Sequence, residues 1–346
     1  MESKIIQNNL NKNEYYESLV LNSNEITTDS FCYLVQDNTF IEFRSLNDIL
    51  YLVYSNEKKF IIIFNLIEFK KESTIKNAHN KYITNFRYYL DEINIRDLII
   101  SISAQDNNLK LWNISNLECL LNIENIYNDG ILSSGVLLNY NNKNYIIVCN
   151  FNVWESEPIK IFDFKGNKIN DIKDNINDKT FFIDVYYDKQ FMKNFILTGN
   201  WGYVKSYDYQ KYKLYHKYCD NDKTTHYNLI VTKTQEITKL IESSRDGNIR
   251  IWNFHNALLL NKINVCKSDI RSICLWENNY IFIGLFEKLK IVDFQMGKII
   301  KVVEFPNYTL NMIKKITHPK FGDCLVSQGL KNEQIKLIFF NGEEKN

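Results

Sequence analysis

Polar and apolar residues alternate in short runs along this chain, and one such run returns seven times. Each copy has a basic or polar residue, two or three apolar residues, and then an aromatic or apolar residue that Asp or Asn usually follows. The clearest copies are NIRIWN at 248–253 and NLKLWN at 108–113. The others are PIKIFD at 158–163, YVKSYD at 203–208, LKIVD at 289–293, FIIIFN at 60–65 and QIKLIFF at 334–340. Alternation over so few residues predicts a β-strand in each copy.

The seven copies are evenly spaced. The position that Trp holds in the clearest copies is occupied in turn by Phe64, Trp112, Phe162, Tyr207, Trp252, Val292 and Ile338. Successive spacings are 48, 50, 45, 45, 40 and 46 residues. A period in the forties indicates a repeat architecture in which each unit is one supersecondary element.

Each repeat predicts four strands. The run ITKLIESS at 237–244 is rich in β-branched residues, a tight polar turn follows at 245–247, and the run at 249–253 returns. Two further extended runs, 227–232 and 258–264, flank this hairpin. Four short strands in one repeat are typical of a propeller blade.

With these repeats, the chain resembles the WD40-repeat family of seven-bladed β-propellers over about residues 31–340. That family builds a buried hydrogen-bond network from a Ser, an Asp and a Trp at the spacing seen in the fifth repeat, with a His before the first strand. The resemblance implies that the network residues of blades two and five are His79, Asp106, Trp112, Ser244, Asp246 and Trp252.

Several positions depart from the family pattern. Ala104 stands where the network Ser of blade two is expected, and no copy contains a literal Trp-Asp pair. Trp201 and Phe286 occupy the turn position of Asp in blades four and six. The resemblance therefore implies an all-β, seven-bladed propeller with degenerate repeats.

The ends of the chain predict how the ring closes. The last copy, at 334–340, is a third strand with few residues after it, and an unpaired apolar edge is a liability that proteins avoid. The apolar run FCYLVQ at 31–36 precedes the first blade, which begins near Thr39. We expect 31–36 to pair beside 334–340 as the missing outer strand, within a single propeller domain at 31–346. Residues 1–30 form a polar extension that is either a disordered tail or contains an added strand, for example at 18–21.

Composition agrees with one compact domain. The hydrophobic content is 45%, with 22 Tyr and 22 Phe, and 11 Gly and 3 Pro leave little material for linkers. The longest apolar runs, such as 60–64, are far shorter than the roughly 20 residues that cross a bilayer. The first residues contain no apolar stretch typical of a secretory signal. We expect no membrane span and a cytoplasmic location, with the nucleus as the alternative.

Charge and candidate chemistry argue against catalysis. Lys and Arg total 42 against 41 Asp and Glu, so the net charge of +1 does not predict nucleic-acid binding. Seven Cys lack a CxxC pair, the five His are far apart, and phosphate-loop, dinucleotide and nucleophile-elbow motifs are missing from the sequence. We expect neither an enzyme nor a metal site, cofactor or small-molecule substrate.

Function is then expected on a surface. In the family, the turn between the second and third strands of each blade lies at the usual docking end of the ring. Exposed Trp and Arg are typical anchors of protein interfaces, so we predict partner binding by Trp154, Trp201, Arg245 and Phe286 on blades three to six. The acidic residues Glu155 and Glu157 beside Trp154 suit a partner segment with a basic residue. In the alternative interpretation, Trp154 and Trp201 fold inward, and Trp201 fills the space of the lost Asp.

Three classes of function fit this fold. The leading one is a non-catalytic scaffold or adaptor that binds a protein segment. The second is a permanent subunit of a large assembly, such as a coat, a cytoskeletal complex or an RNA-processing complex. The third, a phosphoinositide-binding propeller, is disfavoured, because the nearest match to a Phe-Arg-Arg-Gly signature, at 244–247, has an acid where the second Arg is needed.

Overall fold

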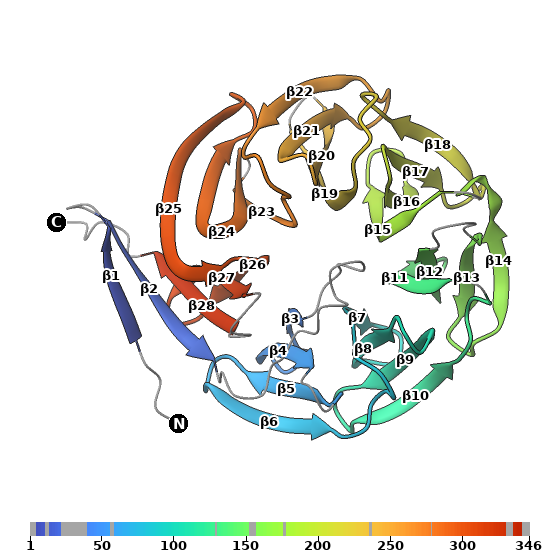
Figure 1. The fold of residues 1–346 in the computed structure, drawn as a ribbon. Helices are drawn as coiled ribbons and strands as arrows, with labels where there is room; N and C mark the ends of the chain where they lie inside the picture. Colours follow the sequence, from blue (N-terminus) through green and yellow to red (C-terminus); the bar gives the residue numbers. More distant parts are fainter. Residues whose placement is uncertain are drawn as a thin grey trace.

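The computed structural model describes residues 5–10, 14–21, 40–55, 59–128, 130–151, 157–175, 178–234, 237–277, 279–329 and 335–340. These residues form seven antiparallel sheets in a ring, with one short 3₁₀ turn at Lys173–Asn175 (Figure 1). The predicted all-β, seven-bladed propeller is confirmed.

Each sheet is one blade, and in blades one to six the strands follow chain order from the axis outward (Figure 1). Blade one contains β3 (Phe40–Arg44), β4 (Leu50–Ser55), β5 (Ile61–Asn65) and β6 (Lys70–Ile75). Blade two contains β7 (Asn85–Asp91), β8 (Arg96–Ser103), β9 (Asn108–Asn113) and β10 (Glu118–Ile123). Blade three contains β11 (Ile131–Tyr140), β12 (Lys143–Phe151), β13 (Ile159–Asp163) and β14 (Lys168–Ile172).

Blade four contains β15 (Thr180–Asp188), β16 (Lys193–Asn200), β17 (Val204–Asp208) and β18 (Lys213–Tyr218). Blade five contains β19 (His226–Lys233), β20 (Thr238–Ser244), β21 (Asn248–Asn253) and β22 (Leu259–Asn264). Blade six contains β23 (Ser272–Glu277), β24 (Tyr280–Asp293) and β25 (Lys298–Thr309). Blade seven contains β26 (Met312–His318), β27 (Gly322–Gln328) and β28 (Ile335–Phe340), joined by β2 (Glu14–Leu21) and β1 (Ile5–Leu10).

Blade six is formed by three strands instead of four, because β24 folds back on itself. The N–H of Phe294 donates to the carbonyl of Asn279, at 3.0 Å, so the two ends of β24 lie together. The bend falls near Glu287, whose φ is 51°. β24 therefore supplies both the second and the third strand of this blade.

The seven sequence copies lie on the third strand of each blade. In blade five the pairing joins Leu240 to Trp252, and in blade two it joins Ile99 to Trp112. Alternate side chains of these strands fill the spaces between neighbouring sheets, because successive residues of a strand point to opposite faces. One such core, between blades one and two, contains Ile63. The repeat thus corresponds to a buried strand in each blade.

The first and last blades pack against each other and share one core. Phe40, Leu52 and Phe64 of blade one contact the cluster that includes Val326 and Leu337 of blade seven. Burial of these side chains contributes free energy that opposes opening of the ring, at about 25 cal/mol for each Å² of apolar area.

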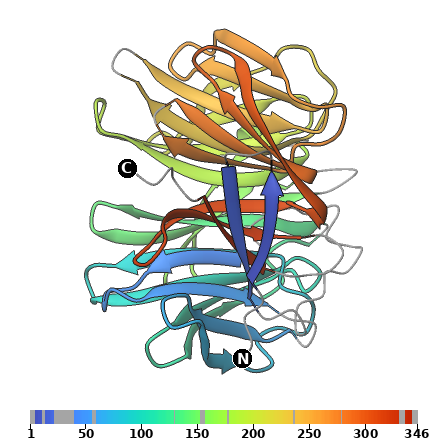
Figure 2. The ribbon, with the colours of Figure 1, turned by 90° about the vertical axis from the view of Figure 1, so that its left-hand side faces the viewer.

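The strand beside β28 differs from the one expected. β28 pairs with β27 on one side and with β2 on the other, in a register that places Leu19 opposite Leu337 (Figure 2). Both edges of β28 are therefore occupied without residues 31–36, which lie outside the described residues. The expected partner was wrong: a strand at 14–21 can offer six consecutive pairs. The role of this strand in closing the ring stays a prediction.

Within the described ranges, no helix is long and apolar enough to cross a membrane.

Candidate docking surface

The blade-four turn carries a half-exposed indole. Trp201 lies between β16 and β17, and 43% of its surface is exposed. The backbone N–H of Trp201 donates to the Lys179 carbonyl at 3.2 Å, and the Lys179 ammonium lies 5.9 Å from the centroid of the indole ring. The following residue, Gly202, has a φ of 84°, which an L side chain rarely adopts. The indole thus extends to the surface on a turn whose backbone is held in place.

Thr225 connects this turn to the next blade. Trp201 forms an isolated antiparallel bridge with Thr225, and the Gly202 N–H donates to Thr224 O at 2.7 Å. On the other side, the N–H of Arg245 donates to Thr225 O at 2.9 Å. Two of the predicted partner-binding residues are therefore brought close together. We call Trp201, Thr225 and Arg245 the Trp201–Arg245 surface.

Phe286 lies farther round the ring. It is 63% exposed and pairs with Thr309 of β25, and the neighbouring Glu287 accepts the N–H of Asn307 at 2.9 Å. These contacts attach it to the segment that leads into blade seven. Among the described residues, no hydrogen bond joins Phe286 to the Trp201–Arg245 surface.

The blade-three loop is described only from Glu157 onward. Trp154 and Glu155 lie outside the described residues. Glu157 accepts the N–H of Asn128 at 2.7 Å and forms an ion pair with Lys160 at 2.8 Å. Its carboxylate is thus engaged within the chain, and the expectation that the acidic pair suits a basic residue of a partner stays a prediction.

A buried ionic network lies beneath Arg245. Arg250 is fully buried, and its guanidinium donates to Asp220 at 2.8 Å, to Ser244 Oγ at 2.6 Å and to Asp246 at 2.6 Å. Ser244 also donates to Asp246. Ser244 and Asp246 thus hold Arg250 rather than Trp252, contrary to the family pattern.

The Trp of blade five bonds to a carboxylate. Trp252 Nε1 donates to Glu242 at 3.2 Å, and the second oxygen of Glu242 contacts His226 Nδ1. Burial lowers the pKa of His226, but the carboxylates of Glu242 and Asp222 outweigh this effect and raise it to about 9. The imidazole is therefore charged at neutral pH.

This network fixes the turn that presents Arg245. Burial raises the pKa of Asp246, yet bonds from Arg250 and Ser244 keep it well below its usual range, so the carboxylate stays ionised. Asp246 also accepts the N–H of Asn248 at 3.1 Å. Gly247 has a φ of 75°, and a Cβ there would lie 2.0 Å from the carbonyl of Cys266. The residues on both sides of Arg245 are thus anchored from below, while Arg245 itself is exposed.

In blade two, the Trp of the repeat is hydrogen-bonded to neutral groups. Trp112 Nε1 donates to Ser101 Oγ at 2.8 Å, and His79 Nε2 lies 2.7 Å from the same oxygen. The network Ser is therefore Ser101, and the interpretation that Ala104 marks its loss was wrong. Asp106 lies away from this pair and accepts the N–H groups of Asn80 and Lys81 at 2.9 and 2.8 Å.

The electrostatics of blade two are opposite to those of blade five. Burial lowers the pKa of His79 to about 4, and the charge of Lys110 acts in the same direction. Since Ser101 accepts from Trp112, its hydroxyl can donate its own proton to the neutral ring. The imidazole of His79 is therefore uncharged at neutral pH.

Sequence reasoning missed Ser101, His226, Glu242 and Arg250. The signal for Glu242 was present, since it is a charged residue inside the apolar run ITKLIESS. Ser101 pairs across the sheet with Lys110, and Glu242 pairs with Arg250. Both acceptors therefore lie two residues after the residue that pairs with the Trp, and this register identifies them.

Comparison with solved structures identifies the fold. Chaetomium thermophilum Raptor superposes with a TM-score of 0.67 at 13% identity, covering 94% of this chain and 30% of the Raptor chain. The β-propeller domain of Myceliophteria thermophila Cps50 (Swd1) superposes with a TM-score of 0.66 at 14% identity, covering 87% of this chain and 98% of that domain. In all, 1435 chains match, so the likeness defines a seven-bladed β-propeller and not one biological role.

No protein-family model matches the chain, and no curated protein matches its sequence. This chain spans 30% of the length of the Raptor chain.

Proposed function

We propose that this chain is a WD40-like scaffold without catalytic activity that docks a protein segment on the end of the ring formed by the second-to-third strand turns. The observation that carries the proposal is the pairing of an exposed Trp with an exposed Arg on two backbone-anchored turns. Trp and Arg are enriched where interface energy concentrates, and a rigid anchor loses little entropy on binding. The proposed docking arc covers blades three to six and includes Phe286 and Trp154 as further anchors.

The partner is expected to be an extended or helical segment rather than a small molecule. The anchors lie on turns of neighbouring blades that Thr225 joins, and Phe286 lies on the next blade. Contact with such an arc requires several residues of a polypeptide. The Lys179 ammonium beside the Trp201 ring, together with the exposed Arg245, favours a segment that combines an apolar residue with a carboxylate.

The test is quantitative affinity purification from the native cell with a Trp201→Ala/Arg245→Ala variant. Phe191→Ala/Lys189→Ala is the matched control, since it removes an exposed aromatic residue and an exposed cation at the other end of the same blade. We expect a partner that is lost from the first variant and retained by the control. An identical set of partners for both variants and the wild type would contradict the proposal.

A second candidate, a permanent subunit of a larger assembly, is favoured by the outer strand of blade six. β25 is 12 residues long, and its exposed residues Ile299, Ile300 and Val302 lie on an outer strand, where proteins usually place charge. The corresponding strand of blade one begins with Lys70 and Lys71. If another subunit covers β25, the chain expressed alone should aggregate, and Ile300→Lys should restore a monomer in size-exclusion chromatography. A wild-type chain that is already monomeric would oppose this candidate.

A further inference from the structure

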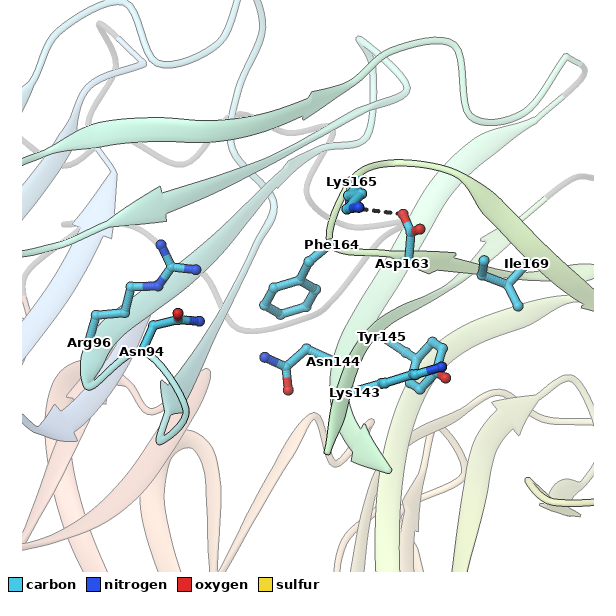
Figure 3. Close-up of a pocket in the computed structure, with 9 residues that line it drawn as sticks. All are labelled: Asn94, Arg96, Lys143, Asn144, Tyr145, Asp163, Phe164, Lys165 and Ile169. Carbon is cyan, nitrogen blue, oxygen red and sulfur yellow. Dashed lines mark hydrogen bonds between the residues drawn. The ribbon is translucent and has the colours of Figure 1, made fainter. Parts of the chain in front are cut away.

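The opposite end of the ring contains a surface pocket of about 520 Å³ between blades two and three. Three turns line it: the β7–β8 turn with Asn94 and Arg96, the β11–β12 turn with Lys143, and the β13–β14 turn with Phe164 and Lys165 (Figure 3). First-to-second and third-to-fourth strand turns lie at the end of a blade away from the second-to-third turns. The pocket is therefore a different surface from the one proposed above.

The pocket is lined by more cations than carboxylates. Arg96, Lys143 and Lys165 carry positive charge, and Asp163 is the carboxylate among the lining residues. Asp163 already accepts the N–H groups of Lys165 and Asn167, at 2.9 and 2.8 Å. These bonds outweigh burial and lower its pKa, so it is ionised but engaged. The lining has a net charge of two positive units.

The cations retain free donors. Arg96 uses its Nε for Asp91, at 2.8 Å, and within the described part of the chain its two Nη groups have no hydrogen-bond partner. Lys143 and Lys165 have no side-chain ion pair among the described residues, and both are exposed. Figure 3 shows the three cations on three separate turns, with Lys143 beside Tyr145 and away from Arg96. A guanidinium fork with its Nη groups unoccupied matches a carboxylate in geometry, and the two ammonium groups add positive charge for further carboxylates.

An apolar surface accompanies the charge. Figure 3 shows the Phe164 ring directed toward the space between Arg96 and Asn144, and the ring also makes an edge contact with Tyr89 at 5.8 Å. Ile169 lines the pocket and is 49% exposed. On the β7–β8 turn, Ile93 and Ile95 flank Asn94 and are exposed as well. The apolar surface thus continues past the pocket, which suits a polypeptide better than a small anion.

We propose that this pocket docks an acidic segment of a partner protein. One carboxylate of the segment binds the Arg96 guanidinium, further acidic residues lie against Lys143 and Lys165, and an apolar side chain packs on Phe164 and Ile169. The charge of the lining selects the sign of the ligand, and the aromatic floor adds affinity that salt does not screen. This inference does not depend on the Trp201–Arg245 surface, because the two sites lie at opposite ends of the blades.

The experiment pans a phage-displayed library of random peptides against the biotinylated full chain. The selected peptides are then titrated by fluorescence anisotropy into the wild type and into Lys143→Glu/Lys165→Glu. The control, Lys71→Glu/Lys298→Glu, makes the same change of net charge on exposed residues of β6 and β25. All four lysines are exposed, so the folds should be unchanged, and equal melting temperatures would establish this.

We expect peptides enriched in Asp and Glu with one apolar residue. Their Kd should rise roughly tenfold or more in Lys143→Glu/Lys165→Glu, and change less than about twofold in the control. Ile169→Ser should weaken binding while leaving its salt dependence unchanged. The Trp201→Ala/Arg245→Ala variant should bind these peptides as the wild type does, so that the failure of one site is distinguishable from the failure of the other.

Three outcomes would overturn the proposal: selection of no peptides, selection of peptides without excess acid, or equal loss of binding in the pocket variant and the control. The proposal would also be overturned if acidic peptides bound Lys143→Glu/Lys165→Glu normally but failed to bind Trp201→Ala/Arg245→Ala. The acidic segment would then bind the Trp201–Arg245 surface at the other end of the ring.

Discussion

Blades two and five hold the Trp of the repeat by different chemistry. In blade two, Trp112 and His79 meet at the hydroxyl of Ser101, and the network is neutral. In blade five, Trp252 and His226 meet at the carboxylate of Glu242, and this network is charged. Equivalent positions on the second strands of the two blades therefore hold either a hydroxyl or a carboxylate as the acceptor for the Trp.

The difference follows from what surrounds the acceptor. Glu242 pairs across the sheet with Arg250, whose guanidinium also reaches Asp220, Asp222 and Asp246. A buried charge is tolerated only when it is paired and hydrogen-bonded, and these carboxylates meet that condition. Ser101 pairs with Lys110, which is half-exposed and leaves the interior uncharged. Charge is concentrated in the blade whose turn presents Arg245.

The largest expected effect is that of Glu242→Ala. It leaves Arg250 and His226 buried without their central carboxylate, and breaking a buried ion pair typically costs about 3–5 kcal/mol. The free energy of unfolding in urea should fall by this amount. Glu118→Ala, on the exposed edge of β10, is the control and should change it by less than about 0.5 kcal/mol. A loss below about 1 kcal/mol for Glu242→Ala would contradict a charged network.

The second prediction separates the blades by pH. The pKa of His226 is raised, so its stabilisation is complete below pH 6.5 and is lost as pH rises toward about 9, a change of roughly 3 kcal/mol. The pKa of His79 is lowered, so its contribution is complete above pH 6.5 and is lost as pH falls toward about 4. The free energy of unfolding in urea should be measured across this pH range. Its fall at alkaline pH should disappear in His226→Gln, and its fall at acid pH should become smaller in His79→Gln. Parallel curves for the wild type and His226→Gln would oppose the assignment.

A smaller effect is expected for Ser101→Ala in blade two. It removes the hydroxyl that Trp112 and His79 share, and removal of one neutral buried hydrogen-bonding partner typically costs about 1–3 kcal/mol. Ser101→Thr keeps the hydroxyl and is the conservative control. In the same urea assay, Ser101→Ala should destabilise the protein less than Glu242→Ala does. The reverse order would contradict a neutral network in blade two and a charged one in blade five.

The smallest effect on stability is expected for Trp201→Ala. Trp201 is 43% exposed, so its truncation should lower the free energy of unfolding by about 0.5 kcal/mol or less. The melting temperature should therefore fall less than in any variant of the buried networks. Differential scanning calorimetry measures this directly. A loss as large as that of Ser101→Ala would mean that Trp201 is a core residue, and would end its role as a docking anchor.

The sequence was sufficient for the repeats and the blade count. The positions of Phe64, Trp112 and Trp252 report a buried third strand, because apolar alternation with a constant period has few other physical causes. Partners in space were harder to predict. Nothing local distinguishes 14–21 from 31–36 as the neighbour of β28, since edge pairing depends on residues more than 300 positions away. Thr225, which brings Trp201 and Arg245 together, is likewise a contact of tertiary structure.

The ionic network was missed for a related reason. Arg250 is the basic residue of its repeat, and a basic residue within a short strand is usually solvated. In the structure its side chain is fully buried. Its partners Asp220 and Asp222 precede β19 in a loop, and chain spacing does not show that they converge on it. The pocket between blades two and three also combines three turns that are separated in sequence.

The most direct test of the difference between the two blades is an NMR titration of the histidine ring nitrogens in uniformly ¹⁵N-labelled protein, with assignments from His79→Gln and His226→Gln. The structure predicts an imidazolium at His226 with a midpoint near pH 9 and a neutral ring at His79 with a midpoint near pH 4. Two midpoints that both fall near pH 6.5, or in the reverse order, would contradict the account of one neutral and one charged network.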